Sequence, residues 1–221
     1  MSTDRTRGRR GRPPLDVFEI EAAKTAILAA AAAVYNRSGT EAPVQEILEE
    51  AKVSRATFYK FFPSKAALQE ALLEFGMEVM FYAIEGAVTQ AEDPIERIDA
   101  AVSTFLSFHA MQPGVYRILL AASLQPDTPS YRIRERAIER YAAFFADEVA
   151  RAGRAPVEPL IYQGLVAAVE GVSIHLLRTG GLVEPGVLER ARVALVRLIA
   201  ATLGEEDDAV PPLPRPEGGP S

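Results

Sequence analysis

A cluster of hydrogen-bond donors follows a tight turn in the first third of the chain. The segment 55–61 is short and rich in aromatic residues, and its phenylalanines are expected to point into a core. The positions that then remain outward are Arg55, Thr57, Tyr59 and Lys60. Guanidinium, hydroxyl and ammonium groups on one helix face donate hydrogen bonds to phosphate oxygens and to base edges in the major groove of DNA. The spacing therefore favours a helix that reads double-stranded DNA.

A second short helix must hold this one at a fixed angle. Pro43, a residue favoured in the first turn, begins that helix. Its buried face is formed by Val44, Ile47, Leu48 and Ala51. Residues 52–54 make a tight turn, in which Ser54 is positioned to cap the next helix. Two short helices joined in this way form a helix-turn-helix, whereas the alternative from spacing alone is a stack of short core helices with solvated charges.

Helical periodicity dominates the chain between its two termini, and no segment shows the period of two that strands require. Proline and glycine pairs divide the periodic region. We predict helices at 19–37, 43–51, 55–61, 65–91, 94–111, 114–124, 129–152, 159–179 and 185–203. Residues 1–16 are predicted to be a disordered basic arm, and residues 204–221 a disordered acidic and proline-rich tail. The predicted fold class is all-α.

The segment VSRATFYKFFPSK, residues 53–65, resembles the turn, recognition helix and fourth-helix start of the tetracycline-repressor (TetR) family. With AILAAAAAVYNRSG before it, the resemblance covers about residues 20–73. Lys52 departs from it, because the family commonly has glycine in this turn. The resemblance implies an N-terminal three-helix DNA-binding domain at 17–68 and a C-terminal helical domain for ligand binding and dimerisation at 69–203.

The same resemblance implies roles for individual residues. Ser54, Arg55 and Thr57 open the recognition helix and would reach bases and nearby phosphates. The residues expected to contact the phosphate backbone are Tyr59, Lys60 and Lys65. The helix dipole at the start of the predicted helix at 65–91 also favours an anion. The expected partner is palindromic double-stranded DNA, bound by a homodimer.

The basic arm carries a shorter motif. Arg10 and Arg12 lie in an Arg-Gly-Arg-Pro sequence that resembles the core of an AT-hook. Such a segment lies extended in the narrow minor groove of A/T-rich DNA, where the potential is most negative. The alternative is a basic tail that binds phosphates without sequence preference.

The last two predicted helices have the composition of a dimer interface. Small and apolar residues lie close to one face of the helix at 159–179, where small residues allow another helix to approach closely. The helix at 185–203 is apolar nearly all round, which indicates more than one partner. The expected interface residues are Ile161, Gly164, Leu165, Ala168, Gly171, His175, Leu188, Ala191, Leu195 and Leu198. The family resemblance implies that this pair forms a four-helix bundle with a second copy. The alternative is an ordinary core within one chain.

The region between these parts is expected to enclose a cavity for a small apolar effector. Its candidate lining is Met77, Met80, Phe105, Phe108, His109, Met111, Tyr116, Phe144, Tyr162, Gln163, Glu170 and His175. Methionine and aromatic residues also fill ordinary cores, and this alternative stays open for each of them.

Charge is distributed unevenly along a chain whose net charge is −6. Residues 1–70 hold 11 Lys and Arg against 9 Asp and Glu, whereas the remainder holds 13 against 21. A local basic footprint, not the overall charge, decides DNA binding. We expect a cytoplasmic protein without membrane contact, because charged residues or glutamine interrupt every hydrophobic stretch.

An enzyme is not expected from these residues. The chain has no cysteine and two isolated histidines, and it lacks a phosphate-binding glycine loop and any metal-ligand spacing. We therefore expect no cofactor and no metal. The sequence predicts a ligand-responsive transcriptional repressor, and the alternative is an architectural or adaptor DNA-binding protein without an effector.

Overall fold

The computed structural model describes residues 17–123 and 125–204. Its helices are α1 (Val17–Ser38), α2 (Val44–Ala51), α3 (Arg55–Phe61), α4 (Lys65–Thr89), α5 (Pro94–Met111), α6 (Pro113–Ser123), α7 (Pro129–Arg151), α8 (Pro159–Thr179), the short 3-10 helix η1 (Gly181–Val183) and α9 (Pro185–Leu203). The described residues contain no strand, and each predicted helix is present with ends within two residues of the prediction. The all-α class is confirmed.

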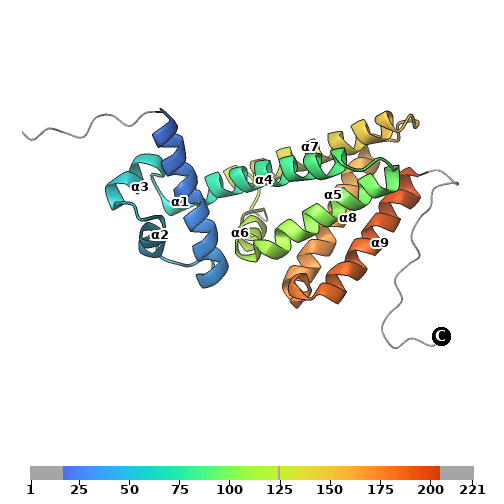
Figure 1. The fold of residues 1–221 in the computed structure, drawn as a ribbon. Helices are drawn as coiled ribbons and strands as arrows, with labels where there is room; N and C mark the ends of the chain where they lie inside the picture. The colour runs from blue at the N-terminus through green and yellow to red at the C-terminus, as the bar shows by residue number, and fades with distance from the viewer. Residues whose placement is uncertain (1–16, 124, 205–221) are drawn as a thin grey trace, which may run out of the picture.

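The first three helices form a small unit at one end of the molecule (Figure 1). An apolar stripe on α1 forms the core of this unit, since Ile27, Val34 and Tyr35 are fully buried. Phe58 is also fully buried and anchors α3 to this core. Lys52 takes the left-handed conformation at φ 54°, so lysine accepts the turn geometry that glycine would adopt more easily.

Helix α4 joins this unit to the body. Ser64 caps it by accepting a hydrogen bond from the backbone N–H of Ala67 at 3.0 Å. From there α4 runs without a break into the body, where it packs on α5, α6 and α7 (Figure 1). The predicted domain boundary at residue 68 therefore lies inside a continuous helix.

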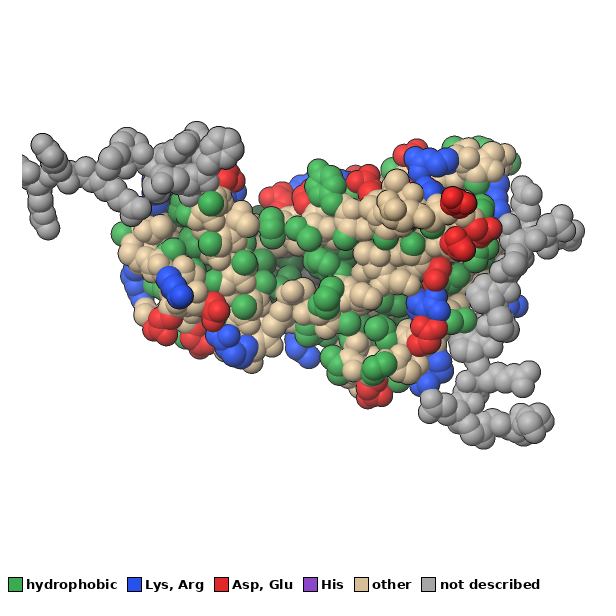
Figure 2. Space-filling view, in the orientation of Figure 1, with side chains coloured by type: hydrophobic (Ala, Val, Ile, Leu, Met, Phe, Trp, Pro, Cys, Tyr) green, Lys and Arg blue, Asp and Glu red, His purple; other side chains and the backbone are tan. Residues whose placement is uncertain are grey.

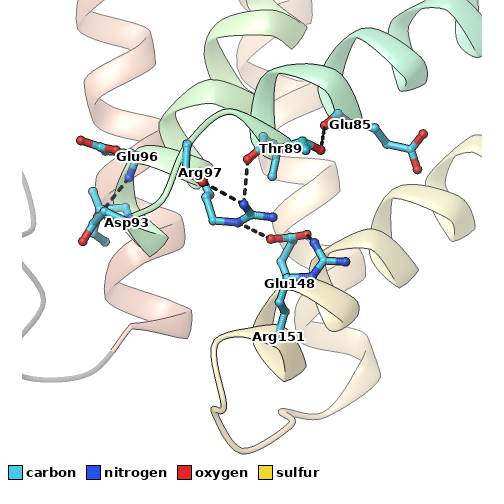
Figure 3. Close-up of polar contacts among 10 residues, drawn as sticks. Glu85, Thr89, Asp93, Glu96, Arg97, Glu148 and Arg151 are labelled. Atoms are coloured by element: carbon cyan, nitrogen blue, oxygen red, sulfur yellow. Dashed lines mark hydrogen bonds and ion pairs between the residues drawn. The ribbon is translucent and has the colours of Figure 1, made fainter.

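At the far end of the body, Arg97 ties three helices together (Figure 3). Its guanidinium donates to the carbonyl oxygens of Val88 and Ala91 at 2.8 and 2.9 Å. These bonds give partners to carbonyl groups at the C-terminal end of α4 that lack one within the helix. The same group donates to Glu148 on α7 at 2.7 Å. Both side chains of this ion pair are less than one fifth exposed.

A second contact joins the two parts of the molecule, between α1 and the start of α6. The Asn36 amide donates to the Gln112 side chain at 2.5 Å and accepts from the backbone N–H of Gly114 at 2.8 Å. Gly114 is buried here, and a Cβ on it would lie 2.3 Å from the carbonyl oxygen of Tyr35. The close approach of α6 to α1 thus requires glycine.

Helix α8 corrects one expectation about hydrophobic length. Its 21 residues include a window with mean hydropathy 1.5, so by length and composition this helix is apolar enough to cross a membrane. Gln163, Glu170 and Arg178 do interrupt α8, as expected, but they are too few to lower the average hydropathy, so the conclusion that no stretch is long and apolar enough was wrong for this helix. In the structure α8 packs against α7 and α9.

Candidate DNA-binding face and body cavity

The start of α3 is fixed by two hydroxyl groups. Ser54 caps the helix by accepting a hydrogen bond from the backbone N–H of Thr57 at 3.0 Å. The two side-chain hydroxyls also lie 2.8 Å apart and hydrogen-bond to each other. Ser54 therefore has a structural role in the free protein beside the DNA contact predicted for it.

The outward side of α3 carries the other predicted donors. The Arg55 guanidinium is exposed and donates to Gln45 on α2 at 3.3 Å, which brings side chains of both helices onto one face. Tyr59 is 45% exposed, and its ring packs edge-on against buried Phe58. Within the described part of the chain, neither Lys60 nor Lys65 forms an ion pair.

This arrangement suits phosphate and base contacts. Lys65 is the first residue of α4, where the helix dipole adds to its positive charge. The structure thus brings Ser54, Arg55, Thr57, Tyr59 and Lys60 together on one short helix and places Lys65 after the turn that follows. Arg10 and Arg12, predicted for the minor groove, lie outside the described residues.

Helices α8 and α9 leave an apolar strip uncovered. On α8 the exposed positions of this strip are Leu160, Ile161, Gly164, Ala167, Gly171 and His175, and α9 adds Leu198. Leu160 is 68% exposed and Leu198 is 45% exposed, and exposed apolar residues that lie next to one another, as on α8, are typical of interaction surfaces. In the view of Figure 2, hydrophobic side chains likewise lie between the charged ones over the body.

Two predicted interface residues lie elsewhere. Leu165 is 5% exposed and Leu195 is 2% exposed, so both belong to the core of a single chain. Ala168, Leu188 and Ala191 are half-buried at the edge of the strip. The sequence indicated one small-residue face on α8 and more than one partner for α9, but it could not tell which apolar positions pack within the chain and which stay exposed.

The body contains a cavity of about 30 Å³ that touches five helices, α4 to α8. Six of the predicted pocket residues line it, namely Met77, Met80, Phe105, His109, Tyr116 and Glu170. Phe108 lines an adjoining cavity of about 20 Å³, and Phe144 lines another of about 40 Å³. The central cavity shares wall residues with each of the other two, so the three cavities lie next to one another in the body.

Other predicted lining residues do not reach this space. Met111 is 67% exposed, Gln163 and His175 are exposed on α8, and the Tyr162 hydroxyl accepts from the backbone N–H of Val157 at 3.3 Å. None of the four lines any of the three cavities. Each was chosen by residue type, but its position on the helix turns it away from α4 and α5.

Sequence reasoning missed the most informative wall residues, Arg134 and Tyr141 of α7. Arg134 donates two hydrogen bonds to Glu170, at 2.7 and 2.5 Å, and the Glu170 side chain is only 14% exposed. The hydrogen bond to Glu170 raises the pKa of Arg134, so the guanidinium stays charged beside this carboxyl group. A charged Arg and Glu on separate helices give no sequence signal of their pairing.

Two buried polar atoms in this cavity have no hydrogen-bond partner: Nε2 of His109 and the hydroxyl of Tyr141. His109 is 4% exposed and stacks on Tyr116, with ring centroids 3.8 Å apart. Burial lowers the pKa of His109 to about 3, so its imidazole is neutral at physiological pH. Burial raises the pKa of Tyr141, so its hydroxyl stays protonated.

The buried histidine predicts acid sensitivity. With a pKa of about 3 in the folded state against 6.5 when exposed, His109 binds fewer protons folded than unfolded over that interval. The free energy of unfolding therefore falls as the pH falls below 6.5, by about 2 kcal/mol down to pH 5. Urea unfolding between these pH values should show this loss. It should vanish in His109→Phe and persist in the control His175→Asn; a loss unchanged in His109→Phe would contradict the assignment.

Comparison with known proteins gives the same result as the geometry. The model of the bacterial regulatory proteins of the tetR family matches residues 27–72. The nucleoid occlusion factor SlmA of Marinomonas sp. (strain MWYL1) is 30% identical over 171 residues, which cover 73% of this chain and 86% of that protein. SlmA of Aliivibrio fischeri (strain MJ11) is 27% identical over 157 residues, or 68% and 80% of the two chains.

Solved structures share the fold. A TetR-family transcriptional regulator from Rhodococcus sp. superposes with a TM-score of 0.66 at 20% identity, over 83% of this chain and 100% of that one. A transcriptional regulator of Saccharomonospora viridis, solved in complex with choline, has a TM-score of 0.66 at 22% identity, over 81% and 96%.

A helix-turn-helix with exposed cations, joined by one helix to a larger helical body, defines a DNA-binding regulator. The chain belongs to the tetR family of bacterial regulatory proteins. It is a regulator and not an enzyme, as the sequence predicted.

Proposed function

We propose that the protein is a repressor that binds a palindromic operator as a homodimer and leaves it when a small molecule occupies the body cavity. The strip on α8 and α9 is the dimer interface in this proposal. One short recognition helix reads few bases, so two copies are needed to select a site. The exposed leucines and glycines of the strip support this pairing.

Release depends on where the cavity lies. Two of its wall residues, His109 and Tyr116, flank the junction of α5 and α6, and that junction is bonded to Asn36 on α1. Met77 and Met80 of α4 form another wall. A ligand that enlarges the cavity moves the two elements that carry the DNA-binding unit. Operator half-sites lie about 34 Å apart, so a shift of a few ångströms disturbs both contacts at once.

The DNA assignment is tested by Lys60→Ala. Loss of one phosphate contact per subunit should weaken operator binding and make the dependence of log K on log salt shallower by about one unit per subunit. The operator is obtained by selecting random duplexes with the wild-type protein, and the selected sites should be palindromic. Binding is then titrated at several salt concentrations.

The matched control is Arg136→Ala, which removes an exposed cation from α7, paired with Glu74 on the surface. This variant should keep the wild-type salt slope, because the cation lies on the body and not on the α3 face. A Lys60→Ala variant with unchanged affinity and slope would show that α3 does not face DNA.

A second candidate function is an adaptor that binds DNA without an effector. Two observations favour it. The relatives are named nucleoid occlusion factors, and this name mentions no small molecule. The three linked cavities hold about 20 to 40 Å³ each, and two further pockets of the body hold about 170 and 240 Å³, so all five are below the 300–1,000 Å³ typical of ligand sites. In this case no small molecule alters operator affinity.

A further inference from the structure

We infer that the body cavity takes an uncharged, mostly apolar molecule with a hydroxyl group, anchored by His109 and Tyr141. The inference rests on the proposed function, since it names the chemistry of the effector for the same cavity. Among the described residues, three buried side-chain polar atoms have no partner, and the inference starts from the two that belong to residues of this cavity, Nε2 of His109 and the Tyr141 hydroxyl. Native proteins rarely leave such atoms unpaired, because each has lost its hydrogen bonds to water on burial.

Both residues line the same cavity, His109 from α5 and Tyr141 from α7. A hydroxyl both donates and accepts hydrogen bonds, so it can satisfy a neutral imidazole in either tautomer and a phenol in either orientation. The surrounding surface is aromatic. Phe105 meets the His109 ring edge-on at 4.4 Å, and Tyr116 stacks on its other side at 3.8 Å.

The charges in the cavity wall exclude an ionic ligand. Arg134 and Glu170 face this space, but each is held by the other through two hydrogen bonds. A carboxylate ligand would need Arg134, and a quaternary ammonium would need Glu170. Either would have to break the pair: a carboxylate would leave Glu170 without its partner, and a quaternary ammonium would leave Arg134 with only Glu135, at 3.3 Å. A neutral molecule leaves the pair intact.

The shape of the space favours an elongated apolar part. Phe105, Tyr141 and Val166 line both the central cavity and the neighbouring one of about 40 Å³. The remaining walls of that neighbour are Ile84, Ala101, Val102, Phe144, Phe145 and Val169, all apolar. These spaces hold only a few atoms, so an alkyl chain would lie there, with its hydroxyl at His109, only in a body whose helices have moved apart.

The test uses three probes with the same eight-carbon chain: 1-octanol, octanoate and octyltrimethylammonium. Each is titrated into the full-length protein by calorimetry at neutral pH. We expect 1-octanol to bind with one site per chain, and at least tenfold more tightly than either ion. His109→Phe and Tyr141→Phe keep the rings and remove one hydrogen bond each, so each should weaken 1-octanol about fivefold.

The matched control is Tyr82→Phe, which removes a phenol hydroxyl from the exposed side of α4, where the side chain is 65% exposed. It should leave octanol binding unchanged, and circular dichroism should show all three variants folded. The inference is overturned if an ion binds as tightly as the alcohol, if neither cavity variant weakens octanol, or if no probe binds.

Operator affinity is measured in the same samples, which separates this inference from the proposed release mechanism. Saturating 1-octanol that lowers operator affinity supports both. If 1-octanol binds with the expected selectivity and variant effects but leaves operator affinity unchanged, the cavity assignment stands and effector-controlled release is wrong.

Discussion

Gly171→Arg is expected to convert the dimer to a monomer and to lower operator affinity on the order of 100-fold or more. Gly171 lies in the middle of the exposed strip on α8, and a Cβ there meets no heavy atom within 4 Å in the single chain. The substitution is therefore compatible with a folded protomer. In the proposed dimer it places an unpaired charge in a desolvated helix contact. Each monomer then binds one half-site and loses the gain from two linked contacts.

Sedimentation at micromolar concentration measures the assembly, and an operator titration measures the affinity. Gly86→Arg is the matched control, because Gly86 is also an exposed helical glycine with open space around its Cβ, but it lies on α4. This control should remain dimeric and bind operator normally. A Gly171→Arg protein that sediments as a dimer would place the interface elsewhere. Leu195, a predicted interface residue, is unsuitable for this test because it lies in the core of one chain.

The sequence was sufficient to predict where the helices begin and end. Their ends coincide with prolines at positions 94, 113, 129, 159 and 185, each at the first turn of a helix, and with glycines such as Gly39 and Gly180 at left-handed turns. Proline and glycine act through backbone geometry within a few residues, so their effect does not depend on the tertiary structure. The signals that predict the recognition helix are equally local, since its capping serine and inward phenylalanines lie within eight residues of one another.

The cavity in the body could be predicted only in part. Five helices line it, and the sequence does not show which of these helices pack against one another. Residue type placed Met80, His109 and Tyr116 in the cavity, but it placed Met111 there as well, and that side chain is exposed. Arg134 and Glu170 are 36 residues apart, and neither shows by itself that it is buried beside the other. The orphaned hydroxyl of Tyr141 is visible only once its surroundings are known.

The contact between α1 and α6 also joins helices whose pairing the sequence does not specify. A substitution in this contact is expected to cause a large loss of stability. Gly114→Ala is expected to lower the free energy of unfolding by about 2–3 kcal/mol, as overpacking of a close contact does. The added methyl would lie 2.3 Å from the Tyr35 carbonyl oxygen and 2.7 Å from the backbone nitrogen of Asn36. Neither is a flexible side chain that could turn aside. Helix α6 must move away from α1, which also breaks the hydrogen bond from Gly114 to Asn36.

Helix propensity alone predicts the opposite sign, since alanine is favoured over glycine inside a helix by up to about 1 kcal/mol. Gly86→Ala provides that comparison, because its Cβ meets nothing within 4 Å on α4. Urea unfolding at one protein concentration should show Gly86→Ala equal to or more stable than the wild type, and Gly114→Ala less stable. If both variants gained stability, the start of α6 would not be pressed against α1, and the proposed path from the cavity to the DNA-binding unit would lose its first step.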